Sequence, residues 1–306
     1  MNYLWGEYRT GKISLNIYNK LVDLFGENIS YSKFTSSLLS LFNKYDFRDY
    51  YYTKGWELQL YDEIFPVLGL GFGFINRTDN NAFNNSNFSF FYKSRKYREN
   101  KLIYENKINA FTAQLTIDIR KFIENGYTRQ RVSRGEIFSK FSGNVIISSK
   151  SFLKSQSDFK IYRFNLYGNI HSFKSTSFVY NVENIFSEGT VPFQMMHALS
   201  GNINNLGKNF TFRTIRLGEV FGDRGFILNT QYDFNDELFR MLKIPLLKNS
   251  QLTLKCHFNA ALISVSEKSK NILRHPYKEF KHPFYELGFG IGHILLPFSL
   301  EFTWKL

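Results

Sequence analysis

The last ten residues of the chain, Pro297-Phe298-Ser299-Leu300-Glu301-Phe302-Thr303-Trp304-Lys305-Leu306, alternate large apolar side chains with polar ones. Successive side chains of a strand point to opposite faces, so every second residue shares a face. A helix would require apolar spacings of three and four, which this segment lacks. The segment is therefore predicted to be a β-strand with one strongly apolar face, formed by Phe298, Leu300, Phe302, Trp304 and Leu306.

The same period of two recurs through the interior of the chain. Residues 110–121, 226–235 and 252–262 each place apolar side chains at alternate positions, as a half-buried strand does. In two further runs, 68–74 and 285–291, most of the alternate positions are glycine. These runs lack the G-x-G-x-x-G spacing of a dinucleotide fingerprint and are predicted as strands in which glycine allows close packing or a bend.

Few segments break this strand pattern. Helices are expected only at about Ser32 to Asn43 and at Asp236 to Leu242, and long polar loops are expected at 76–87 and 264–282. Long loops that alternate with tight turns are typical of a barrel with two different rims. No linker or shift of composition divides the chain, so residues 1–306 are predicted to form one domain.

Composition also favours a sheet in which apolar and polar residues are interspersed. The chain has 34 Phe, 19 Tyr and 3 Trp, and 43 % of its residues are hydrophobic, yet its mean hydropathy is −0.29. The longest apolar run, Ile64 to Ile75, contains a proline and three glycines and is predicted as a strand, because a membrane helix needs about 18 apolar residues. The first residues lack the pattern of a signal peptide, so a signal, and with it whole domains, is expected upstream.

Two architectures fit these strands. The clean runs are as long as a tilted transmembrane strand of about 9–11 residues, whereas soluble strands are usually about 5–6 residues long. Together with the aromatic excess and the last strand, this length favours an all-β, antiparallel transmembrane β-barrel of about 12–16 strands, present here as a C-terminal fragment or as a whole. The last strand should then pair with the first, because an unpaired edge is costly in lipid. A soluble β-sandwich that binds carbohydrate stays open as a weaker alternative.

Several motifs carry a family resemblance. The terminal alternation resembles the signal by which outer-membrane barrels are recognised for insertion. The chain resembles an uncharacterised outer-membrane family of Gram-negative bacteria whose full-length members carry a carboxypeptidase-regulatory-like domain before the barrel. The matching segments are 47–55, 189–192 with His197 and 201–202, 219–223, 244–248 and 283–292. That family is distantly similar to barrels that assemble outer-membrane proteins or secrete polypeptides, which implies up to sixteen strands, an outer-membrane location and the barrel-assembly machinery as a partner.

The net charge of +13 indicates acidic partners, for which outer-membrane lipid or lipopolysaccharide is expected and nucleic acid is not. One basic loop is a candidate for glycolipid contact, although a merely solvated loop fits it too: Lys93, Arg95, Lys96, Arg98 and Lys101. A second charged group should face the lumen or a rim, because charges are costly against lipid. It is expected to fix a lumen plug, to line a conduit, or to form only a structural ion-pair network: Arg213, Arg216, Glu219, Asp223 and Arg224.

No catalytic motif stands out. The six histidines show no H-E-x-x-H spacing, a G-x-S-x-G elbow is missing, and the single cysteine, Cys256, can form neither an intramolecular disulfide nor a cysteine-based zinc site. We therefore expect no enzyme, no metal and no cofactor. The first hypothesis is a barrel for envelope biogenesis or for transport of an unknown cargo, with a periplasmic partner left open. The second is a structural or surface-binding barrel with a plugged lumen.

Overall fold

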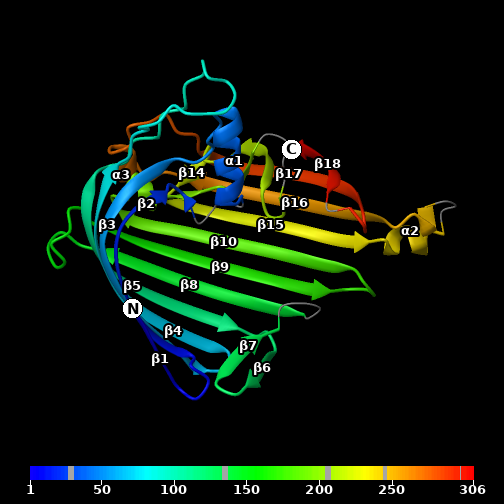
Figure 1. Ribbon diagram of the computed structural model, residues 1–306. Helices are drawn as coiled ribbons and strands as arrows, with labels where there is room; N and C mark the ends of the chain where they lie inside the picture. The colour runs from blue at the N-terminus through cyan, green and yellow to red at the C-terminus, as the bar shows by residue number, and fades with distance from the viewer. Residues whose placement is uncertain (27–30, 133–136, 204–207, 244–246, 297) are drawn as a thin grey trace.

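An antiparallel sheet of twelve strands forms the body of the molecule in the computed structural model (Figure 1). The structure describes residues 1–306 except 27–30, 133–136, 204–207, 244–246 and 297. Each strand pairs with its neighbour along the chain, apart from local insertions between β5 and β8 and between β10 and β15. In spatial order the strands are β1 (Asn2–Trp5), β2 (Gly11–Asp23), β3 (Tyr50–Phe65), β4 (Leu68–Asn81), β5 (Asn106–Asp118), β8 (Phe138–Ser148), β9 (Phe159–His171), β10 (Ser177–Gly189), β15 (Arg224–Asn235), β16 (Leu252–Ser264), β17 (Phe280–His293) and β18 (Ser299–Lys305).

The connections differ between the two ends of the sheet. At one end, here called the long-loop rim, lie the connections 24–49, 82–105, 149–158, 190–223 and 265–279. At the other end, the short-turn rim, the connections include 6–10, 66–67 and 172–176. Two longer ones there carry the hairpin of β6 (Phe122–Asn125) and β7 (Thr128–Arg131) and the helix α2 (Glu237–Met241). The predicted alternation of long loops and tight turns is therefore confirmed for most of the sheet.

The outer face of the sheet is a continuous apolar belt. In register, Leu58 of β3 lies opposite Phe74, which lies opposite Phe111 of β5. The belt continues through Leu166, Val182, Leu228, Ala260 and Tyr285 on β9 to β17. Large side chains along it are exposed, including Trp56, Phe72, Phe164, Leu287 and Trp304. The period of two in the sequence thus places the apolar side chains on one face of the sheet.

The inner face carries the polar side chains that alternate with this belt. Asn229, Asn259 and Glu286 lie side by side across β15, β16 and β17, and all three are buried. Hydrogen bonds join Asn229 to Asn259 at 3.0 Å and Asn259 to Glu286 at 3.2 Å. Glycines also face inward on β4, where a Cβ on Gly69 would lie 2.0 Å from Oη of Tyr61. The predicted role of these glycines in close packing is confirmed there.

Local predictions hold for the two expected helices and fail at three other segments. Helix α1 (Lys33–Asn43) and helix α2 cover the two expected helical segments. A third short helix, α3 (Glu267–Lys270), lies in the segment 264–282 that was predicted as a loop. The polar stretch beginning at Asn76 is not a loop up to Asn81, because β4 extends through it and its alternate side chains bond inside the sheet. The apolar run Ile64–Ile75 is not one strand, because β3 and β4 meet in a turn at residues 66–67.

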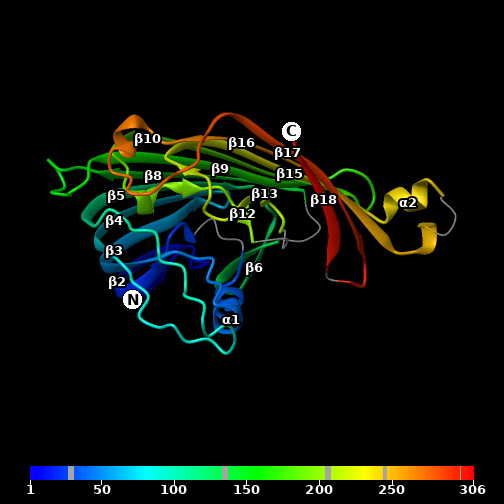
Figure 2. The ribbon, with the colours of Figure 1, turned by 90° about the horizontal axis from the view of Figure 1, so that it is seen from above.

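The sheet is open between its first and last strands. Within the described residues β1 pairs with β2 and β18 with β17, and neither makes a second pairing. The predicted pairing of the last strand with the first is therefore wrong for this structure. The physical reason is the shape: the sheet curves through only part of a circle, leaving a trough (Figure 2). The sandwich alternative is also wrong, because it requires two large sheets packed face to face.

No helix among the described residues is long and apolar enough to cross a membrane.

Candidate functional site

Residues 190–223, here called the insert, leave the long-loop rim after β10 and fold along the concave face of the sheet before β15 begins (Figure 2). The insert contains the turn η2 (Phe193–Met195) and four short strands: β11 (His197–Ala198), β12 (Gly201–Asn202), β13 (Phe212–Arg216) and β14 (Phe221–Gly222). β11 pairs with β14 and β12 with β13, so the segment doubles back on itself. Its residues 204–207 lie outside the described part of the chain.

Apolar packing holds the insert against the wall. Phe193 and Phe221 of the insert pack with inward residues of β5, β8 and β9, including Ile108 and Ile161. Phe212 and Val220 pack with a second group on β10, β15, β16 and β17, which includes Ile263. Full burial of one such side chain stabilises a fold by about 1.5–3 kcal/mol. The insert is therefore part of the core of the molecule rather than a surface loop.

A buried carboxylate anchors strand β13 of the insert. Glu286 of β17 is fully buried and accepts hydrogen bonds from the backbone nitrogens of Arg213 at 3.1 Å and Thr214 at 2.6 Å. It also accepts from the Thr214 hydroxyl and from Nδ2 of Asn259. A buried charge is costly unless it is paired and fully hydrogen-bonded. Glu286 thus fixes the position of β13 against the inner wall.

The guanidinium of Arg213 extends this anchor to the last strand. Its Nε donates to Oε2 of Glu301 on β18 at 3.1 Å, and both side chains are largely buried. Next to it, His257 Nε2 of β16 and Thr303 Oγ1 of β18 lie 3.0 Å apart. Arg213 thus binds groups on β17 and β18, and the contact between His257 and Thr303 joins β16 to β18 beside it.

The two ends of the insert are held together by the short helix α3 (Glu267–Lys270) in the connection before β17. Asp223, at the end of the insert, accepts from Ser266 N at 2.7 Å, Ser266 Oγ at 2.6 Å and Ser269 Oγ at 2.7 Å. Ser269 Oγ in turn accepts from the backbone nitrogen of Val191, near the start of the insert, at 3.0 Å. Asp223, Ser266, Ser269 and Val191 thus form a hydrogen-bonded group, here called the clasp, that joins the two ends of the insert at the long-loop rim.

Glu219 makes a separate contact outside the sheet. It accepts from Lys278 Nζ at 2.8 Å and from the backbone nitrogen of Arg216 at 2.9 Å. Burial alone would raise the pKa of Glu219, but the hydrogen bonds from Lys278 and Arg216 outweigh it, and the pKa is lowered. This pair joins the turn before β14 to the connection 265–279.

The five charged residues predicted as one cluster thus occupy several places. Arg213 lies at the inner wall, Asp223 in the clasp, and Glu219 with the backbone of Arg216 at the rim. Arg224 donates to the carbonyl of Ser187 and lies over the ring of Phe186. The sequence missed their partners Glu286, Glu301 and Ser269, which lie far along the chain from the residues they bind.

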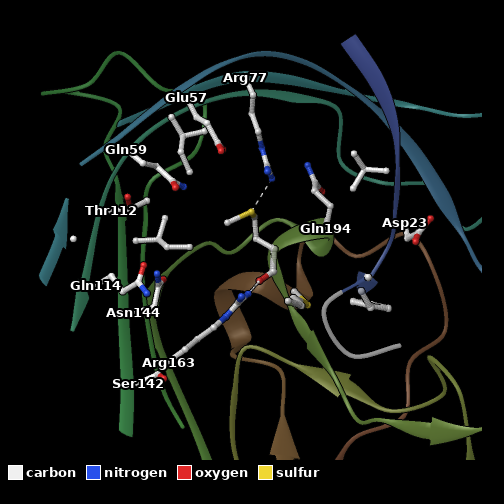
Figure 3. A pocket seen from close by; sticks show the side chains of 18 of the residues that line it. Asp23, Glu57, Gln59, Arg77, Thr112, Gln114, Ser142, Asn144, Arg163 and Gln194 are labelled. Carbon is white, nitrogen blue, oxygen red and sulfur yellow. Dashed lines mark hydrogen bonds between the residues drawn. The ribbon is translucent and has the colours of Figure 1, made fainter. Parts of the chain in front are cut away.

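A cavity of about 800 Å³ lies beside the insert, between η2 and the inner faces of β2–β5, β8 and β9. Arg77 and Arg163 reach the turn η2 from different strands (Figure 3). Arg77 Nη2 contacts the Met195 sulfur at 2.8 Å, and Arg163 Nη2 donates to the Met195 carbonyl at 2.7 Å. The two arginines therefore hold the side of the insert that faces the cavity.

Amides, hydroxyls and charged groups share the cavity wall with apolar side chains such as Phe72 and Ile146. The labelled side chains in Figure 3 include Gln59, Thr112, Gln114 and Asn144. Behind them, fully buried Asp79 pairs with Arg77 at 3.1 Å and accepts from Gln194 Nε2 at 3.2 Å. The polar part of this wall offers hydrogen bonds to water. Arg77 and Asp79 were missed as site residues because their segment was predicted as a loop.

Comparisons with known proteins place this architecture. No family model matches the sequence, and no curated protein matches it. Among solved structures, a crystal structure of BamA from Haemophilus ducreyi lacking POTRA domains 1–3 is similar, with a TM-score of 0.54 and 11 % sequence identity. The fold is BamA-like. The match covers 100 % of this chain and 57 % of that chain, so this chain spans little more than half of the BamA chain.

The likeness confirms the predicted all-β architecture and, at the level of fold, the predicted similarity to outer-membrane assembly barrels. The resemblance to the uncharacterised family with a carboxypeptidase-regulatory-like domain stays a prediction. Of the segments that carried it, residues 244–246 lie outside the described residues.

The predicted basic loop lies at the long-loop rim of the BamA-like sheet, but its five residues differ in their exposure and in their partners. Lys101 Nζ donates to the carbonyl of Gly218 in the insert at 2.8 Å, and desolvation by burial lowers its pKa. Arg98 pairs with Asp49 at 2.9 Å. Lys93, Arg95 and Lys96 are exposed. Lys101 therefore supports the insert, and only the other end of the loop presents free charge.

The last strand of the BamA-like sheet has the apolar face that the sequence predicted. Leu300, Phe302 and Trp304 lie on its outer side, opposite Ile291, Phe289 and Leu287 of β17. Phe298, at 69 %, and Leu306, at 68 %, are also exposed. Their use as an insertion signal stays a prediction.

The histidines of the BamA-like structure take part in structural contacts where partners are defined. His197 pairs with Glu183 at 3.0 Å, and His275 Nε2 lies 3.0 Å from the carbonyl oxygen of Leu102. Across the part of the chain that the structure describes, no group of three His, Cys, Asp or Glu side chains could hold a metal ion.

Proposed function

We propose that this chain forms the wall of an outer-membrane β-barrel in a Gram-negative bacterium. The observation that carries the proposal is the outer face, where apolar side chains run in register from β2 to β18 while polar ones face inward. In water such a belt would be a liability, whereas in a bilayer it is the required surface. The short-turn rim then faces the periplasm and the long-loop rim the outside.

Within that membrane, the chain serves envelope biogenesis or the transport of a cargo. The cavity beside the insert supports this role, because its amide, hydroxyl and charged side chains allow water to occupy a space along the inner wall. The role needs no enzymatic step. A periplasmic partner or domain acts with it, as the resemblance to the carboxypeptidase-regulatory-like family implies. The barrel-assembly machinery inserts it, and the terminal residues Phe298 to Leu306 are the signal.

Membrane insertion is tested by gel migration of the detergent-refolded chain with and without boiling. A faster unboiled band, together with protease protection of the strands in lipid vesicles, is expected. Good solubility in plain buffer without a shift would reject the membrane location. Aggregation without a shift would show that the open edges of β1 and β18 need a further partner, since an unpaired edge cannot face lipid.

A second candidate, a structural or surface-binding barrel with a plugged lumen, is favoured by the burial of Glu286 under the insert. Conductance of vesicle-inserted protein separates the two. Transport along the cavity predicts a current that the substitution Gln114→Arg reduces, because this side chain lines the cavity. A plugged barrel predicts no current in the native chain and a current only when Glu286 is replaced.

A further inference from the structure

A surface at the long-loop rim combines exposed aromatic rings with free positive charge. Helix α1 and the connection 82–105 lie side by side above the trough (Figures 1 and 2). On the helix, Phe34 is 71 % exposed, and Leu38, Leu41 and Phe42 are exposed as well. On the connection, Phe88, Phe90, Phe91 and Tyr92 are each more than half exposed. Apolar exposure of this kind on one patch marks an interaction site.

The connection is fixed to the helix rather than hanging free. Phe90 N donates to the carbonyl of Leu41 at 2.9 Å, and Ser89 Oγ donates to the same carbonyl at 2.8 Å. The rings of Phe42 and Phe90 stack with centroids 5.5 Å apart. Tyr97 Oη donates to the carbonyl of Ser40 at 2.9 Å. The exposed rings are thus held in place by backbone contacts beneath them.

A buried lysine sets the direction of the neighbouring charges. Lys44, which ends α1 and is 3 % exposed, donates from Nζ to the carbonyls of Lys93 at 2.9 Å and Arg95 at 2.7 Å. Lys44 thus fixes the backbone at Lys93 and Arg95, and the side chains of Lys93, Arg95 and Lys96 are exposed. Among the described residues these three side chains make no ion pair. The charge of Lys44 lies directly below them and adds to their positive potential.

We propose that this aromatic–basic surface binds a phosphorylated glycolipid of the outer leaflet. The surface consists of Phe34, Leu38, Leu41, Phe42, Phe88, Phe90, Phe91, Tyr92, Lys93, Arg95 and Lys96. The inference rests on the proposed function, which places the long-loop rim at the outer membrane surface. Cationic side chains pair with phosphates, and aromatic rings settle at the boundary between apolar and polar groups. A ligand that satisfies both halves of the surface is anionic and amphiphilic, as a phosphorylated glycolipid is.

The test uses the refolded chain in vesicles of a neutral phospholipid, titrated with a lipid A-type bisphosphorylated glycolipid. The triple variant Lys93→Ala, Arg95→Ala and Lys96→Ala should bind on the order of a hundredfold more weakly at low salt. The difference should shrink at high ionic strength, because exposed charges are screened. The double variant Phe90→Ala and Phe91→Ala should also bind more weakly, with no such salt dependence.

A matched control removes the same charge elsewhere. Lys150, Lys243 and Lys268 are exposed and lie outside the surface, and their combined replacement by Ala should leave binding nearly unchanged. Equal losses in the two triple variants would mean that net charge alone acts and would overturn the proposal. So would equal binding of a dephosphorylated glycolipid, or equally tight binding of inorganic phosphate alone.

Two further readouts keep this inference separate from the proposed function. Each variant is first checked for heat-modifiable migration, so a chain that inserts but does not bind glycolipid overturns the inference alone. A chain that never inserts overturns the proposed function. The variant Lys44→Met keeps all three surface charges but releases the carbonyls of Lys93 and Arg95. It should weaken binding if the arrangement matters, and unchanged binding would reject the preorganised surface.

Discussion

The carboxylate of Glu286 on β17 accepts a hydrogen bond from the backbone nitrogen of Thr214 in the insert at 2.6 Å. The two residues are 72 positions apart in the chain, and the carboxylate is fully buried. A side chain from the wall thus satisfies the backbone of the insert where water cannot reach. Together with the apolar packing of Phe193 and Phe212, this contact ties the insert to the wall.

Replacing Glu286 by Ala should loosen the insert. The change leaves two backbone N–H groups, the Thr214 hydroxyl and the Asn259 amide without their buried acceptor, at a cost of about 1–3 kcal/mol for each buried donor left unpaired. The unboiled band should unfold at a lower temperature, and residues 190–223 should become open to protease. The control Glu188→Gln changes an exposed carboxylate at the end of β10 and should behave like the native chain. An unaltered protease pattern in the Ala variant would contradict the anchor.

Replacing Asp223 by Ala should open the clasp at the long-loop rim. Three hydrogen bonds to Ser266 and Ser269 are lost from a buried site, at a cost of about 1–3 kcal/mol. Faster amide hydrogen exchange is expected around Val191 and in the connection 265–279. Glu267→Ala, which removes an exposed carboxylate of the same connection, serves as the control. Equal exchange in both variants would argue against the clasp.

The pair of Glu219 and Lys278 should depend on pH. The pKa of Glu219 is lowered, so the carboxylate stabilises the fold above the unfolded pKa of about 4.3 and loses this contribution as pH falls through the lower folded value. Native chain and Glu219→Gln should therefore differ slightly at pH 7 and converge in acid. The difference in unfolding temperature between the two chains, followed from pH 7 to below pH 3, checks this. A constant difference would mean that the charge of Glu219 is not involved.

A charge on the outer belt should prevent insertion, whereas a charge on the inner wall should not. Leu166 lies near the middle of β9, on the outer face and 37 % exposed. Leu166→Arg should cost about 2–4 kcal/mol in a bilayer and should reduce the heat-modifiable fraction. Gln114→Arg introduces the same charge beside the cavity and should insert normally. Normal insertion of both variants would speak against a lipid-facing belt.

The sequence predicted the wall well because each strand carries its own signal. Alternate positions such as Phe111, Ala113 and Leu115 face outward as expected. Helices α1 and α2 lie where helices were predicted, whereas the short helix α3 was not predicted. Local periodicity suffices for such elements. Periodicity gave the wrong prediction at Arg77 and Asp79. These polar residues form hydrogen bonds on the inner face of the sheet, and without knowledge of their partners a polar segment is predicted as a loop.

The site could be predicted only in part. Arg213, Glu219 and Asp223 are close in sequence, which suggested one cluster, but the chain turns between them and directs each side chain to a different element. Their partners Glu286 and Glu301 belong to strands much later in the chain, and no local pattern links them to the insert. The open edge between β1 and β18 could not be predicted either. The alternation of residues in a strand shows which side chains share a face, but it does not show which strands pair.

The contacts of the insert with β17 and β18 also constrain the order in which parts of the chain can assemble. Residues 190–223 are synthesised before β16, β17 and β18, yet Arg213 binds groups on β17 and β18. The contacts of Arg213 can form only after β17 and β18 have been synthesised, and contacts of such long sequence separation make folding slow. The insert bound in this way therefore indicates that β17 and β18 have already joined the sheet.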